Sequence, residues 1–151
     1  MKIIYKQGDL LECSEDVIVH GCNAQGVMGS GVAKAIKEKY PTAFYFYQKE
    51  YKQGVGYIIP VNVADCKVVI NAITQEYYGR NKNVVYADYD GIAICFRDIN
   101  KWCKMKGVNK IALPKIGAGL ANGDWNIIEK IIEEECTDVQ PVVYVLEGEL
   151  N

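Results

Sequence analysis

Short apolar runs alternate with longer amphipathic segments along the whole chain. The apolar runs are predicted β-strands, and they cover residues 3–5, 17–21, 57–63, 67–72, 110–114 and 142–146. The amphipathic segments are predicted helices, and they cover residues 32–40, 89–104 and 125–135. In the second of these, Ile92, Phe96, Ile99 and Cys103 recur at spacings of four, three and four, which is typical of one buried helix face. In the third, Ile127, Ile128, Ile131 and Ile132 form a comparable stripe.

Strands that alternate with helices predict the α/β class. We expect a three-layer α/β/α sandwich with a mixed, largely parallel central sheet. No linker, repeat or low-complexity segment divides residues 1–151, so we expect a single domain. In such sheets, ligands bind outside the carboxyl ends of the strands, which is where two glycine-rich loops fall.

The first glycine-rich loop follows the apolar run that ends at His20. It passes through glycines at positions 26, 29 and 31 into a helical segment that Pro41 is expected to end. A strand, a glycine-rich loop and a helix together bind phosphates, because backbone N–H groups can approach the ligand and the helix N-terminus favours negative charge. The loop lacks the Gly-Lys-Ser/Thr ending of a P-loop and the G-x-G-x-x-G spacing. The Asn23 amide before it can hold a sugar hydroxyl or a water molecule.

The second glycine-rich loop lies in Ile111-Ala-Leu-Pro-Lys-Ile-Gly-Ala-Gly-Leu-Ala-Asn-Gly-Asp-Trp125, again between a strand and a helix. Two such loops could hold the two ends of one extended anionic ligand, such as a diphosphate with a sugar on each side. Turn geometry alone is the alternative explanation for these glycines.

Two side chains are candidates for proton transfer. His20 is the only histidine, and its ordinary pKa of about 6.5 suits acid–base catalysis near neutrality. Asp124 could position a water molecule, although it also stands where a helix N-cap is expected. A structural role is an alternative for both residues.

Composition narrows the function classes further. A net charge of −2 and a pI near 5.5 give no general attraction to nucleic acid or to an anionic membrane. The six cysteines form no C-x-x-C pair and indicate reduced cysteines in a cytoplasmic protein. We expect no signal peptide, no membrane span, no metal site and no cofactor.

The motifs taken together resemble the macrodomain family from about residue 3 to residue 147. The resemblance lies in Gly8-Asp9-Leu10, Val19-His20-Gly21-Cys22-Asn23, the run from Gly26 to Ala33, the run from Leu113 to Leu120, and Asp124-Trp125. Within this family, the chain resembles the branch that holds the small ADP-ribose 1''-phosphate phosphatases, the terminal ADP-ribose protein glycohydrolases and the antitoxin-type DNA ADP-ribosyl glycohydrolases. Gln75-Glu-Tyr-Tyr-Gly-Arg80 and Tyr86-Ala-Asp-Tyr89 are most similar to the phosphatase-like bacterial and phage members.

The resemblance implies a binding mode for ADP-ribose. It implies that Asp9, next to Leu10, accepts a hydrogen bond from the adenine amino group, and that Asn23 contacts the distal ribose. The residues implied around the diphosphate and the distal ribose are Gly29, Ser30, Gly31 and Val32 in the first loop and Ile116, Gly117, Ala118, Gly119 and Leu120 in the second. A histidine at the position of His20 is proposed to act in some phosphatase members. Tyr77, Tyr78 and Tyr86 are candidates for the edge of the distal pocket.

Two departures from the family pattern bear on the reaction. Gln75 stands where the glycohydrolase members have a lysine, and Ala121 stands where the terminal glycohydrolases have an aspartate. An amide cannot form the covalent lysine–sugar intermediate. The resemblance therefore implies metal-independent hydrolysis of ADP-ribose 1''-phosphate, with Asn23, His20 and Asp124 as the catalytic residues. The alternatives are a non-catalytic reader of ADP-ribose, an O-acetyl-ADP-ribose deacetylase and another ADP-ribosyl hydrolase.

Overall fold

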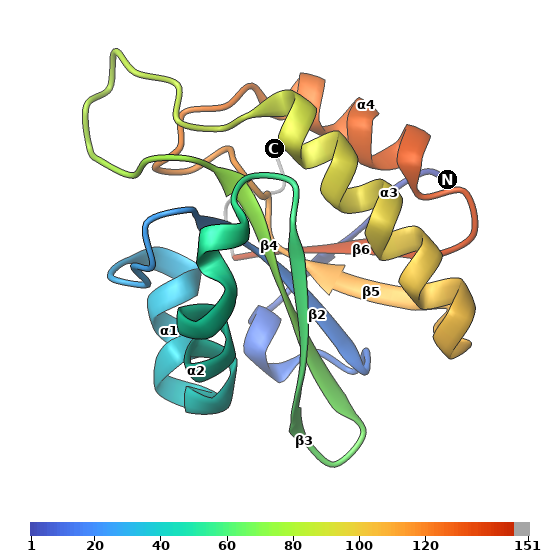
Figure 1. Cartoon of the computed structure of the whole chain (residues 1–151). Coiled ribbons are helices and arrows are strands. Elements are labelled where there is room, and N and C mark those ends of the chain that lie inside the picture. The colour runs from blue at the N-terminus through green and yellow to red at the C-terminus, as the bar shows by residue number, and fades with distance from the viewer. Residues whose placement is uncertain (147–151) are drawn as a thin grey trace.

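The computed structural model describes residues 1–146, and it confirms the predicted α/β/α sandwich with a mixed sheet (Figure 1). The strands are β1 (Ile4–Gln7), β2 (Val17–Asn23), β3 (Ile58–Ala64), β4 (Lys67–Gln75), β5 (Lys110–Leu113) and β6 (Gln140–Val145). The helices are α1 (Gly31–Lys39), α2 (Pro41–Glu50), α3 (Tyr89–Lys106) and α4 (Trp125–Glu135), with short 3-10 turns η1 (Leu10–Glu12) and η2 (Tyr51–Gln53). Within residues 1–146, no helix combines the length and the apolar composition needed to cross a bilayer.

The sheet has the strand order β1-β6-β5-β2-β4-β3. Every neighbouring pair is parallel except β3 and β4, which form an antiparallel hairpin. Helices α3 and α4 cover one face of the sheet, and α1 and α2 cover the other. The carboxyl ends of β2, β4 and β5 therefore meet at one edge in the middle of the molecule, and β4 runs three residues beyond its predicted end.

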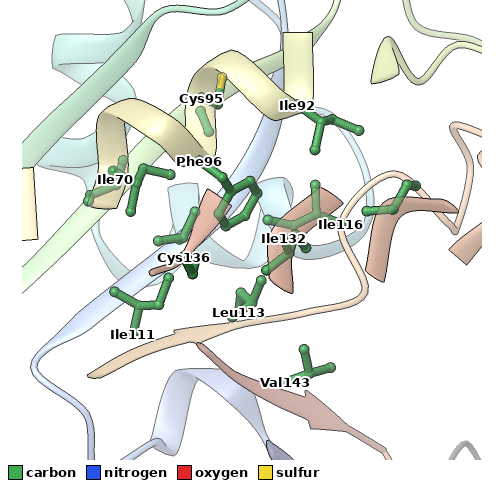
Figure 2. Packing of buried hydrophobic residues seen from close by; sticks show 14 of the residues in the cluster. Ile70, Ile92, Cys95, Phe96, Ile111, Leu113, Ile116, Ile132, Cys136 and Val143 are labelled. Carbon is green, nitrogen blue, oxygen red and sulfur yellow. The ribbon is translucent and has the colours of Figure 1, made fainter. Parts of the chain in front are cut away.

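The larger core lies between the sheet and helices α3 and α4 (Figure 2). Phe96 and Ile92 of α3 pack above Ile111 and Leu113 of β5, and all four side chains are fully buried. The predicted apolar face of α3 is confirmed. The predicted stripe on α4 is wrong in part, because Ile127 is 43% exposed and only Ile128 and Ile132 are fully buried.

Helix α2 was not predicted, because Pro41 was interpreted only as the end of the preceding helix. Pro41 is the first residue of α2, where its fixed φ suits a helix and its missing N–H costs nothing. The helix buries Ala43 and Tyr47 against the sheet. Proline therefore separates two consecutive helices at this point.

A buried polar pair joins strands β2 and β4. His20 Nε2 lies 2.6 Å from Asn71 Oδ1, and Asn71 Nδ2 donates to the Ala43 carbonyl of α2 at 3.1 Å. His20 is 1% exposed and Asn71 is fully buried. Burial lowers the pKa of His20 to about 4, although the hydrogen bond to Asn71 opposes this shift. The expected titration of His20 near neutrality is thus corrected.

This pKa shift predicts how stability changes with pH. Between pH 6.5 and about 4, His20 takes up a proton in the unfolded chain but stays neutral in the folded protein, so stability falls as the pH falls through this window. Above pH 6.5, His20 is neutral in both states and has no such effect. The free energy of unfolding should therefore fall by about 2 kcal/mol more in the wild type than in His20→Gln between pH 7.5 and pH 5. Urea denaturation measures both proteins, and parallel pH dependences would contradict the burial of a neutral histidine.

Candidate functional site

A cleft of about 780 Å³ opens at the sheet edge where β2, β4 and β5 end. This volume lies within the range of small-molecule and cofactor sites, about 300–1,000 Å³. Three segments of the chain enclose the cleft, one after each strand. The lining residues are Gly21, Cys22, Asn23, Val27, Gly29, Ser30, Gly31, Val32, Ala33, Thr74, Gln75, Tyr78, Gly79, Arg80, Pro114, Lys115, Ile116, Gly117, Gly119, Leu120 and Ala121.

The loop after β2 is held in shape by the Asn23 side chain. Asn23 Oδ1 accepts hydrogen bonds from the backbone N–H groups of Gln25 at 3.0 Å and Val27 at 3.3 Å, and Nδ2 donates to the Val27 carbonyl at 2.8 Å. The Tyr47 hydroxyl of α2 supports the loop by donating to the Asn23 carbonyl at 2.6 Å. Gly26 has φ +81°, and a Cβ there would lie 2.8 Å from the Tyr51 ring, so this position requires glycine. Asn23 therefore both builds the loop and faces the cleft.

Helix α1 directs an uncapped N-terminus at the cleft. Its N-cap residue Ser30 makes no side-chain capping bond, and Gly31, Val32 and Ala33 of its first turn line the cleft. The first N–H groups of a helix lack partners inside the helix and attract anions. Helices α3 and α4 differ, because the carboxylates of Asp88 and Asp124 cap them. Helix α2 also lacks a side-chain cap, but its first residues do not line the cleft, whereas those of α1 do.

The loop after β5 forms the opposite wall. Gly117 has φ +78°, and its carbonyl accepts from the Gly123 N–H at 2.7 Å, which closes the loop on itself. The Ala121 carbonyl accepts from the N–H groups of Tyr86 and Ala87, and Asn122 Nδ2 donates to the Asn81 carbonyl. These bonds fix the loop against the segment that precedes α3.

The segment after β4 forms the end of the cleft. Gln75 lies opposite Asn23 in the sheet, and its side-chain amide donates to the Tyr77 carbonyl at 2.8 Å. Ala24 N–H donates to the Glu76 carbonyl, which joins this segment to the Asn23 loop. Tyr78 and Arg80 then line the cleft. In Figure 1 the long loop between β4 and α3 extends beyond the edge of the sheet.

The charge in the cleft is opposite to that of the protein. The chain has a net charge of −2, yet Arg80 and Lys115 line the cleft and no aspartate or glutamate of residues 1–146 does. Cys22 is buried, and its burial raises the pKa of the thiol well above the usual value. The arrangement suits an anionic ligand and offers no histidine or carboxylate among the lining residues that the structure describes.

Some residues expected at the site lie outside the cleft lining. His20 is on the same strand as Asn23 but turns into the core, where it meets Asn71 and Cys22. The Asp124 carboxylate accepts a hydrogen bond from the Asn126 N–H at 2.9 Å. Asp124 is thus the N-cap of α4, which was the structural alternative to a catalytic role. Asp9 caps η1 by accepting from the Leu11 N–H at 2.9 Å. Leu10, which is buried, and Ala118 also lie outside the lining.

Most of the other expected residues are brought together around the cleft. They are Asn23, Gly29, Ser30, Gly31, Val32, Ile116, Gly117, Gly119 and Leu120. Thr74, Arg80 and Lys115 also line the cleft but were not predicted from the sequence. The signal for Thr74 was its place just beyond a predicted central strand, while nothing in the spacing of Arg80 shows that its loop folds back. Across residues 1–146, no group of three or more His, Cys, Asp or Glu side chains could hold a metal ion.

Known proteins similar to this chain bind or process ADP-ribose, according to their names. The DNA ADP-ribosyl glycohydrolase of Mycobacterium tuberculosis (strain ATCC 25618 / H37Rv) is 28% identical over 155 residues, which cover 97% of this chain and 43% of that protein. The ADP-ribose glycohydrolase OARD1 of Bos taurus is 28% identical, and the aligned residues cover 96% of this chain and 92% of that protein. The ADP-ribose 1''-phosphate phosphatase of Meyerozyma guilliermondii is 25% identical, and the aligned residues cover 96% of this chain and 99% of that protein. This chain thus spans less than half of the mycobacterial relative.

A solved structure and a family model agree with these relatives. The macrodomain of Mycobacterium tuberculosis DarG superposes with a TM-score of 0.80 at 26% identity, over 94% of this chain and 96% of that one. The family model described as Macro domain matches residues 19–132, which include most of β2, the cleft loops and most of α4. The chain therefore belongs to the Macro domain family.

Proposed function

We propose that the cleft binds ADP-ribose and that the chain hydrolyses ADP-ribose 1''-phosphate to ADP-ribose and phosphate. The observation that carries the proposal is a cleft with positive charge, an uncapped helix N-terminus and no acidic lining residue in the described chain, within a protein of net negative charge. A diphosphate is the ligand group that such a cleft favours. The names of the relatives support the same class of ligand.

The order of strands suggests how the ligand lies. Asp9 follows the edge strand β1, the 116–120 loop follows β5, Asn23 ends β2, and Arg80 follows β4. Because the carboxyl ends of parallel strands share one edge, these positions form a row. The adenine would lie toward Asp9, the diphosphate between the first turn of α1 and the 116–120 loop, and the distal ribose beside Asn23.

The choice of reaction rests on chemistry, because relatives named for both reactions lie at 25–28% identity. Gln75 and Ala121 both line the cleft. An amide at position 75 is not a nucleophile, and a methyl group at position 121 cannot assist opening of the sugar ring. These side chains disfavour cleavage of a glycosidic bond through a covalent lysine intermediate, and they leave phosphoryl transfer to water open.

The proposed reaction uses the substrate itself for proton transfer. Water attacks the phosphorus, the bond between phosphorus and the C1'' oxygen breaks, and this oxygen must gain a proton. A phosphate monoester has a second pKa of about 6, so its singly protonated form can supply that proton. The protein would contribute position and charge: Asn23 orients the ribose, and the N–H groups of α1 stabilise negative charge. In this mechanism neither His20 nor Asp124 transfers the proton, although both were candidates for that role in the sequence.

A direct experiment separates an enzyme from a reader of ADP-ribose. Calorimetry with ADP-ribose tests binding, and phosphate release from ADP-ribose 1''-phosphate tests turnover. Binding with release supports the proposal. Binding without release would make the chain a reader, and the absence of both would remove ADP-ribose as the ligand of the cleft.

Ala33→Asp tests the anion site at α1. The new carboxylate would lie in the first turn of the helix within the cleft, where it would repel the diphosphate and compete for the same N–H groups. We expect calorimetry to show ADP-ribose affinity about tenfold lower or weaker still. Lys34→Asp is the control, because it changes the net charge more but lies outside the lining. Equal losses in the two variants would show that overall charge, and not the helix terminus, governs binding.

The pH dependence of turnover tests the source of the proton. If the singly protonated phosphate is the reactive form, kcat/KM falls about tenfold per pH unit above a pH of about 6. His20→Gln should have the same profile, since His20 does not line the cleft and its pKa is about 4. A limb of the wild-type profile that disappears in His20→Gln would restore the histidine to the mechanism.

The chain should not remove ADP-ribose from DNA or from glutamate side chains at a useful rate. The reason is the amide at position 75 in place of an amine. The measurement is release of free ADP-ribose from modified DNA and from a glutamate-modified peptide, beside phosphate release from ADP-ribose 1''-phosphate. Comparable rates would contradict the proposed reaction and show that residue 75 does not decide it.

A further inference from the structure

The positions at the carboxyl ends of the parallel strands form a row along one edge of the sheet. Arg80 lies at one end of this row, and Asp9 lies at the other end. Asp9 follows β1 at one edge of the sheet, and Arg80 belongs to the segment that follows β4, beyond Asn23 and its neighbour Gln75. A ligand whose adenine lies toward Asp9 therefore presents its far end to Arg80. That end is the C1'' position of the distal ribose in the proposed binding mode.

The Arg80 side chain is exposed, lines the cleft, and has no hydrogen-bond or ion-pair partner within residues 1–146. The other arginine of the chain, Arg97, differs because it makes a two-point ion pair with Glu135 at 3.1 Å. An arginine that lines an acid-free cleft without a protein partner is available to an anion in the cleft.

The backbone that bears Arg80 is held on both sides. Gly79 lies against the Tyr86 hydroxyl with no room for a Cβ, and the Asn81 N–H donates to the same hydroxyl at 3.3 Å. The Asn81 carbonyl accepts from Asn122 Nδ2 of the second glycine-rich loop at 3.0 Å. The start of the side chain is thus fixed relative to the cleft wall, which lowers the cost of ordering its guanidinium group.

We propose that Arg80 is the specificity-determining residue for a phosphate on the distal ribose. The inference rests on the proposed function and deepens it. The planar guanidinium group donates two parallel hydrogen bonds to a phosphate, which a ribose hydroxyl at the same place cannot match. Arg80 thereby discriminates ADP-ribose 1''-phosphate from ADP-ribose, and the diphosphate common to both ligands is left to α1 and the 116–120 loop.

The test compares two ligands across three variants. Arg80→Gln removes the charge, Arg80→Lys keeps the charge without the two-point geometry, and Lys82→Gln removes an exposed charge two residues away that does not line the cleft. For Arg80→Gln, kcat/KM for ADP-ribose 1''-phosphate should fall about 10- to 100-fold, while the Kd of ADP-ribose changes less than about twofold. Arg80→Lys should recover part of the loss, and Lys82→Gln should match the wild type.

The outcomes separate this inference from the proposed function. Unchanged kcat/KM in Arg80→Gln, or an equal loss for both ligands, would overturn the role of Arg80 while leaving the phosphatase proposal standing. If the wild type binds both ligands but releases no phosphate, calorimetry with ADP-ribose 1''-phosphate gives the same comparison as a ratio of Kd values. If the wild type binds neither ligand, the proposed function fails, and this inference fails with it.

Discussion

The hydrogen bond between His20 and Asn71 is the contact on which the geometry of the cleft depends. The two residues are register partners on β2 and β4, and both are buried between apolar side chains. A slip of one residue would leave each polar group without its partner and turn it to the other face of the sheet. Each buried polar group left without a hydrogen-bond partner lowers the free energy of unfolding by about 1–3 kcal/mol. The apolar side chains around the pair carry no such penalty, because one apolar neighbour can replace another after a shift in register. This pair therefore fixes the register that apolar strands alone would leave weakly specified.

The cleft follows from that register. With β2 and β4 aligned, Asn23 lies opposite Gln75, and the segments after both strands meet at one edge. Asn23 then shapes its loop so that the first turn of α1 faces the space between them. Backbone N–H groups supply the attraction for an anion, and the acidic caps stay on α3 and α4. The site thus relies on main-chain geometry more than on reactive side chains, which suits binding of a diphosphate.

Glycines between a strand and a helix marked both cleft loops in the sequence. Apolar periodicity was enough to predict the layers, because burial of one face determines where strands and helices pack. It failed at α2, since a proline can end one helix and begin the next with the same fixed φ. It also failed to show that His20 is buried. His20 and Cys22 lie on the same face of β2, and periodicity cannot tell whether that face is covered by α2. Arg80 could not be found for a related reason, because its position depends on how a loop folds back through Tyr86 and Asn122.

A crystal structure with bound ADP-ribose would show which groups of the cleft contact each part of the ligand. We expect the diphosphate between the N–H groups of the first turn of α1 and the 116–120 loop, with the adenine toward Asp9 and C1'' toward Arg80. A ligand bound in the reverse direction, with its adenine beside Arg80, or bound away from the N-terminus of α1, would contradict this binding mode.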